Sequence, residues 1–136
     1  MDLSLFETDA NKSKDGVWCP IDAVTNLRIA RYGNAKFKRY LEREMKPYKR
    51  LIDKGALKEE TADKILAGAI ASTILVDWEN MEYNGEPLAY SHEAAVKILL
   101  DPKLRDFRDV VVELSQDMQL FKEEEVEEDA GNSQSS

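Results

Sequence analysis

Residues 78–100 constrain the fold of this 136-residue chain more than any other stretch. They run from Trp78 through the polar turn Asn-Gly-Glu-Pro (84–87) to Ser91 and an alanine-containing segment that ends at Leu100. Serine is a preferred helix N-cap, and glycine and proline favour a reversal of the chain. The stretch therefore predicts a helix, a compact turn and a second helix.

Apolar residues at helical spacing predict further helices on both sides of this stretch. In total, we expect helices at about residues 34–54, 58–82, 91–100 and 102–121. Asn34 can cap the start of the first of them. Pro47 should bend or end that helix near Lys46, because proline removes a backbone hydrogen bond. The helix at 58–82 has apolar residues on more than one side, so we expect it at the centre of the fold.

The sequence as a whole predicts a mainly α-helical fold with a short N-terminal β-hairpin. Two short runs with β-forming residues, 17–21 and 27–32, predict that hairpin at about 16–33, packed against the helices. Residues 1–121 are expected to form a single helical domain, since one domain usually takes about 100–200 residues. Residues 122–136 are rich in charge and poor in apolar side chains, which predicts a disordered acidic C-terminal tail.

An apolar seam follows the last expected helix. Its members recur at spacings of three and four residues: Leu104, Phe107, Val111, Leu114, Met118 and Phe121. Such a seam is more often core than docking surface. With Val110 and Val112, however, this helix presents more apolar surface than one neighbouring helix needs. We therefore expect the seam, with Trp78 and Tyr90 at its base, to bind a partner or a second copy of the chain.

Residue types that carry catalysis are not grouped in this sequence. His92 is the only histidine, and its neighbour Ser91 cannot face it, because adjacent residues of a helix point in different directions. The single cysteine, Cys19, excludes a disulfide within the chain and has no sequence signal for activation. Glycine-rich phosphate loops and metal-ligand spacings are also missing. We expect no catalytic, cofactor-binding or metal-binding residues, and no enzymatic activity.

Charge is distributed unevenly along a chain whose formal net charge is −8. Residues 28–54 contain ten Lys and Arg against three Asp and Glu, so the alternative is a small regulatory or nucleic-acid-binding module that uses this segment. The overall negative charge argues against nucleic acid, and an acidic partner surface or the chain's own acidic tail fits the bases at least as well. No apolar run approaches the roughly 18 residues of a membrane span, so we expect no membrane contact.

Several elements follow one another in a fixed order between residues 60 and 130. They are Trp78, Asn84-Gly85-Glu86-Pro87-Leu88, Tyr90-Ser91, Ala94-Ala95, Leu99-Leu100-Asp101, Phe107 and the Glu-rich stretch 123–128. Their ordered combination resembles the tail assembly chaperones of long-tailed, siphovirus-type bacteriophages.

This resemblance implies a non-enzymatic role in viral morphogenesis. Proteins of that family bind the tape-measure protein, keep it soluble and help to recruit the tail-tube protein. They act in the host cytoplasm and are absent from the mature virion. A structural component of the virion is a third interpretation that the sequence leaves open.

Overall fold

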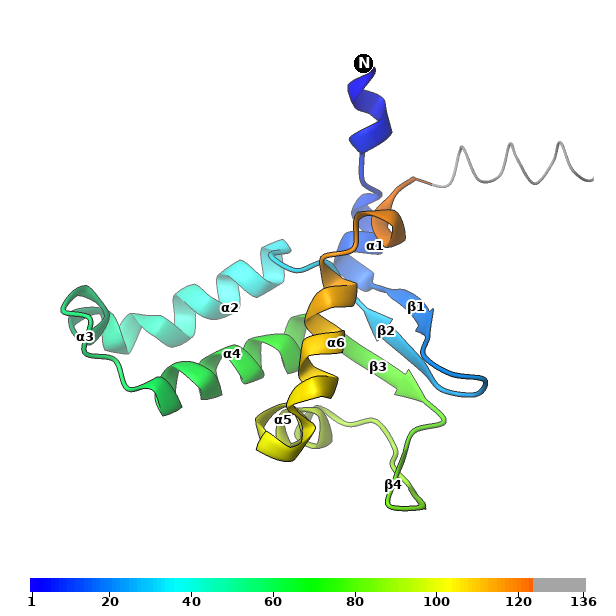
Figure 1. The fold of residues 1–136 in the computed structure, drawn as a ribbon. Helices are drawn as coiled ribbons and strands as arrows, with labels where there is room; N and C mark the ends of the chain where they lie inside the picture. Colours follow the sequence, from blue (N-terminus) through cyan, green and yellow to red (C-terminus); the bar gives the residue numbers. More distant parts are fainter. Residues whose placement is uncertain (124–136) are drawn as a thin grey trace, which may run out of the picture.

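A computed structural model describes residues 1–123 of the chain (Figure 1). In chain order its elements are η1 (Leu3–Phe6), α1 (Ala10–Asp15), β1 (Val17–Pro20), β2 (Asn26–Ile29), α2 (Ala35–Met45), η2 (Lys46–Tyr48), α3 (Lys49–Asp53), α4 (Glu59–Thr73), β3 (Leu75–Glu79), β4 (Glu82–Tyr83), β5 (Glu86–Pro87), α5 (His92–Leu100), η3 (Pro102–Leu104), α6 (Arg105–Ser115) and η4 (Met118–Phe121), where η marks a 3-10 turn. The expected disordered tail, apart from its first two residues, lies outside the described residues.

The fold is mixed α/β, so the expectation of a mainly α-helical domain with an N-terminal hairpin is wrong. Strands β1, β2 and β3 form a three-stranded antiparallel sheet with β2 in the centre, and β4 and β5 form a separate two-stranded sheet. The hairpin of β1 and β2 is present, but β3 pairs with its other edge. This third strand supplies the support that an isolated two-stranded hairpin lacks.

The helix expected at 58–82 is wrong beyond residue 73. Helix α4 ends at Thr73, and the chain continues into β3. Asn34 Nδ2 donates a hydrogen bond to the Thr73 carbonyl (3.1 Å), which gives one of the last helical carbonyls a partner. Leu75 and Trp78 then pair with β2, and this pairing with a distant strand overrides the helical spacing of the apolar side chains.

The helix expected at 102–121 is interrupted as well. Helix α6 ends at Ser115, and Asp117 has extended backbone angles (φ −75°, ψ 110°). Its carboxylate accepts a hydrogen bond from the Gln119 N–H (3.0 Å) and so caps η4. Met118 and Phe121 therefore do not continue the surface of α6.

The helix expected at 34–54 begins and breaks for the reasons given by the sequence. Asn34 caps α2 by accepting a hydrogen bond from the Phe37 N–H (2.9 Å). Helix α2 then ends at Met45, and Pro47 lies in the short turn η2 before α3 begins.

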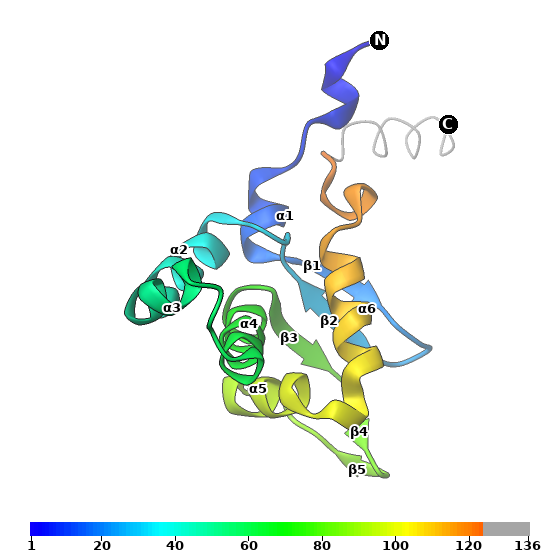
Figure 2. The ribbon, with the colours of Figure 1, turned by 60° about the vertical axis from the view of Figure 1, so that its left-hand side comes forward.

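Helices α2, α3 and α4 form a helical hairpin that extends to one side of the sheet, and α5 packs against α4 (Figures 1 and 2). Tyr40 of α2 lies directly against Gly68 of α4, where a Cβ atom would collide with the tyrosine hydroxyl. Glycine at this position therefore lets the two helices of the hairpin pack closely.

One face of the three-stranded sheet forms part of the core. Its register aligns Cys19 with Leu27 and Leu27 with Trp78, and all three side chains are buried. Helix α6 packs over this face (Figure 1) and adds the buried Val111. The opposite face carries the half-buried Arg28.

The two ends of the described chain lie side by side. Thr8 pairs with Lys122 in an isolated β-bridge, and the Asp9 N–H donates to the Phe121 carbonyl (2.8 Å). Before this point, η1 projects from the fold, and none of its residues is buried (Figure 2).

Candidate partner-binding surface

The structure separates the eight residues for which we expected partner contact. Trp78, Val111 and Phe121 are buried in the core. Four others are half-buried, namely Tyr90, Leu104, Phe107 and Leu114, and all of these but Leu104 pack against the core. Met118 is exposed. The seam is therefore largely internal, and its buried members cannot contact a partner in this conformation.

Trp78 and Tyr90 hold the corner between β3 and α5. Their rings meet edge to face with centroids 4.9 Å apart. Trp78 Nε1 donates to the Leu88 carbonyl (2.8 Å), and the Tyr90 hydroxyl donates to the Leu75 carbonyl (3.2 Å). Burial and, secondarily, the charge of Asp77 raise the pKa of Tyr90. These contacts occupy the polar atoms of both rings within the protein.

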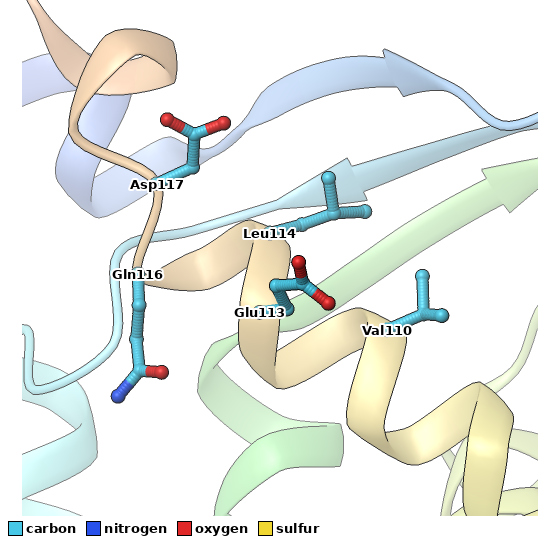
Figure 3. Close-up of a pocket in the computed structure, with 5 residues that line it drawn as sticks. All are labelled: Val110, Glu113, Leu114, Gln116 and Asp117. Carbon is cyan, nitrogen blue, oxygen red and sulfur yellow. The ribbon is translucent and has the colours of Figure 1, made fainter.

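The apolar side chains that are accessible on α6 and η4 coincide only in part with the expected seam. Val110 is 39% exposed, Met118 is 44% exposed, and the half-buried Leu114 lies between them in the sequence. Val110 and Leu114 are four residues apart and project to the same side of α6 (Figure 3). We call Val110 and Leu114 of α6, together with the exposed Met118 of the following turn η4, the α6 face.

The α6 face borders a shallow hollow with acidic edges. Val110, Glu113, Leu114, Gln116 and Asp117 line this hollow (Figure 3). Both Glu113 and Asp117 are exposed. The hollow therefore suits a ligand that offers apolar and basic side chains together.

A second hollow lies at the tip of the β1–β2 hairpin. It is lined by Ile21, Asp22, Val24, Thr25, Leu27, Asn80, Met81, Glu82 and Phe107. Asp22 Oδ1 accepts hydrogen bonds from the N–H groups of Thr25 (2.7 Å) and Val24 (2.9 Å), and these bonds lower the pKa of Asp22. Phe107 belongs to this hollow, so the structure places it apart from Met118.

Comparison with known protein families indicates the origin of this chain. A model of the family described as YdaY prophage protein matches residues 32–132. This chain belongs to the YdaY prophage protein family. Its bacteriophage origin follows from that membership. No curated protein and no solved structure matches the chain.

In this YdaY-family protein, the family match includes the α6 face and the whole helical hairpin of α2, α3 and α4. It leaves out η1, α1, β1 and β2, which precede residue 32. Membership of the family gives a phage origin and names no ligand.

In the basic segment 28–54, Phe37 and Tyr40 face inward and most of the bases face outward. Phe37 is buried, and Tyr40 packs on Gly68. Arg28 donates to the Asp15 carbonyl (2.9 Å), whereas the bases of α2, η2 and α3 are exposed. Neither Phe37 nor Tyr40 is therefore placed to stack on nucleobases.

The described residues contain no group of three or more His, Cys, Asp or Glu side chains that could hold a metal ion. Cys19 is buried, and burial followed by the charge of Asp117 raises the pKa of its thiol. His92 is exposed at the first position of α5. No helix between residues 1 and 123 has the length and apolar character needed to cross a membrane.

Proposed function

We propose that this prophage protein is a tail assembly chaperone that binds the tape-measure protein, keeps it soluble and assists tail-tube assembly without catalysis. The α6 face carries the proposal, because Val110 and Met118 are exposed and Leu114, one helical turn after Val110, is only half-buried. Membership of a prophage family and the ordered motifs between Trp78 and Phe107 support it.

A long helical client can be held by a small number of such contacts. An amphipathic helix binds a groove through apolar residues spaced three or four positions apart, and Val110 and Leu114 have this spacing on α6. The exposed carboxylates of Glu113 and Asp117 keep the edge of the contact charged, and net charge helps to keep a complex soluble.

The proposal includes the setting expected from the sequence. The protein would act in the host cytoplasm, recruit the tail-tube protein as a second partner and be absent from the mature virion. A structural virion protein would instead be found in purified particles, so mass spectrometry of those particles separates the two roles.

The direct test is co-expression with the tape-measure protein of the same prophage. We expect Val110→Asp combined with Met118→Asp to lower the soluble fraction of tape-measure protein by about tenfold, because each change places a charge in the apolar contact. Val24→Asp, at an exposed apolar position of the hairpin tip, is the matched control and should leave solubility unchanged.

Two results would contradict this proposal in different ways. If the double variant solubilises the client as well as the wild type, the α6 face is not the contact. If the wild-type protein itself leaves the tape-measure protein insoluble and unbound, the chaperone role is wrong.

The exposed bases of α2, η2 and α3 favour one alternative, a regulatory or nucleic-acid-binding module that uses residues 28–54. Such binding would weaken steeply as salt is added, because each phosphate contact releases counterions. Fluorescence anisotropy with random-sequence duplex DNA at low salt tests it, and absence of binding there would remove the alternative.

A further inference from the structure

The far end of the helical hairpin is both basic and apolar. We call residues 46–58, which join α2 to α4, the basic tip. They contain five bases, Lys46, Lys49, Arg50, Lys54 and Lys58, against the single acid Asp53. Leu51 is 43% exposed and Ile52 is 38% exposed within this charged surface. None of the five bases forms an ion pair with another residue of the described chain.

The N-terminal arm, residues 1–9, has the opposite character. Leu3 is 71% exposed, Phe6 is 53% exposed, and Leu5 between them is exposed as well. The arm contains three acids, Asp2, Glu7 and Asp9, and no Lys or Arg. It is therefore an acidic segment with a dense group of uncovered apolar side chains.

The arm is a structured projection. The Ser4 N–H donates to Asp2 Oδ1 (2.9 Å), which caps η1, and the Glu7 N–H donates to the Ser4 carbonyl (3.1 Å). The capping hydrogen bonds from Ser4 lower the pKa of Asp2, so its carboxylate stays ionised at neutral pH. At its root, the arm is fixed by the bond from Asp9 to Phe121.

Arm and basic tip lie at different ends of the molecule. In Figures 1 and 2 the N-terminus projects away from the sheet, while α3 marks the far end of the helical hairpin. The arm of one copy therefore does not cover the basic tip of the same copy, and a second copy can offer its tip to that arm.

We propose that the N-terminal arm of one copy docks on the basic tip of a second copy. Leu3, Leu5 and Phe6 would cover Leu51 and Ile52, which removes apolar surface of both segments from water. The carboxylates of the arm would lie beside the bases of the tip, and this complementarity fixes the orientation of the contact.

Charge selects the basic tip over the two hollows described above. The α6 face is edged by Glu113 and Asp117, and the hollow at the hairpin tip is edged by Asp22 and Glu82. Both edges repel an acidic arm. The bases of residues 46–58 attract it.

This contact is head-to-tail, because it joins two different surfaces. Each copy keeps a free arm at one end and a free tip at the other, so further copies can add to form a ring or an open filament. The contact uses no residue of the α6 face and does not depend on the chaperone role.

Sedimentation velocity of the full chain, untagged at its N-terminus, tests the proposal from micromolar to submillimolar concentration. We expect the wild type to increase in mass as concentration rises. We expect two variants to associate at least about tenfold more weakly than the wild type. They are an arm variant (Leu5→Ser with Phe6→Ser) and a tip variant (Leu51→Ser with Ile52→Ser). Ile21→Ser with Val24→Ser, two exposed apolar positions of the hairpin tip, should associate like the wild type.

A mixing experiment tests the head-to-tail geometry. The arm variant keeps an intact tip and the tip variant keeps an intact arm, so an equimolar mixture should form one-to-one dimers that neither variant forms alone. Circular dichroism of each variant should match the wild type, because all four substituted side chains are exposed.

Three outcomes would overturn the proposal. They are a wild type that stays monomeric throughout the concentration range, an arm variant that associates as strongly as the wild type, and a mixture of folded variants that stays monomeric.

Discussion

Arg108 of α6 and Asp63 of α4 form an ion pair, with Arg108 Nη1 3.0 Å from Asp63 Oδ1. The arginine side chain is only 7% exposed, whereas the aspartate side chain is 44% exposed. A guanidinium at this depth needs a partner, because burying an unpaired charge costs far more than burying a paired one. The pair therefore fixes α6, which carries the α6 face, against the helical hairpin.

Asp63→Asn should destabilise the fold by about 1–3 kcal/mol, because it leaves the buried Arg108 without its counter-charge. Urea denaturation monitored by circular dichroism measures this loss. Asp109→Asn is the matched control, since Asp109 pairs with Arg105 on the exposed surface of α6. Its cost should stay below about 0.5 kcal/mol, and equal costs for both variants would contradict a structural role of the buried pair.

Gly68→Ala should also destabilise the protein, by about 1–2 kcal/mol, although alanine favours a helix more than glycine does. The new methyl group would collide with the Tyr40 hydroxyl. Tyr40→Phe removes that hydroxyl, so Gly68→Ala should cost less in the Tyr40→Phe background. A double-mutant cycle of unfolding free energies measures the difference. A Gly68→Ala variant that is more stable than the wild type would contradict the close packing of α2 on α4.

Tyr90→Phe should cost about 1 kcal/mol, because it removes the hydrogen bond to the Leu75 carbonyl while keeping the ring against Trp78. Tyr83→Phe, at an exposed position, is the control. The pKa of Tyr90 is raised in the folded state above its ordinary value of 10.0. The folded state therefore binds the hydroxyl proton of Tyr90 more tightly than the unfolded state does. The resulting contribution to folding stability is lost as the pH rises through the folded pKa.

Tyr90→Phe should accordingly reduce the loss of stability at alkaline pH. Thermal unfolding at neutral pH and above pH 10 measures this effect for the wild type and for both tyrosine variants. An identical alkaline loss in wild type and Tyr90→Phe would show that Tyr90 is not the responsible group.

The Cys19 thiol should react with a disulfide reagent at least about tenfold more slowly in the folded protein than in the unfolded protein, because the reactive species is the thiolate. Cys19 is buried, and burial raises the pKa of its thiol. A chromogenic disulfide reagent releases a coloured thiolate when it reacts with Cys19. The rate of this release in native buffer and in concentrated urea gives the reaction rates of the folded and the unfolded protein. Comparable rates would mean that β1 opens readily.

Sequence signals that act over a few residues predicted the corresponding structure well. Asn34 caps α2, and Ser91 caps α5 by accepting a hydrogen bond from the Ala94 N–H (3.0 Å). Pro47 ends α2 as expected. Each of these signals works through backbone groups close by in the chain, so no knowledge of distant contacts is needed.

Strand β3 could not be predicted in the same way. Leu75 and Trp78 fit the apolar spacing of the preceding helix, and their strand geometry comes from pairing with Ile29 and Leu27. Those partners lie far away in the sequence, and strand formation depends strongly on such a context.

The candidate site was predicted in part. Met118 is accessible as expected, but Val111 and Phe121 are buried, and Val110 takes the exposed position on α6. Val111 lies on the side of α6 that packs on the sheet, and the break between α6 and η4 takes Phe121 off the line of α6. Asp117, a residue type that often caps a helix start, is the sequence signal that could have indicated the break.

The bridge between Thr8 and Lys122 has a consequence for synthesis of the protein. A ribosome makes the chain from its N-terminus. Thr8 therefore cannot pair with Lys122 until nearly the whole described chain has been made. The pairing of β1 with β2 and the packing of α2 on α4 need only residues made earlier. Until translation has passed Phe121, the nascent chain therefore carries its N-terminal segment without the contact that anchors it.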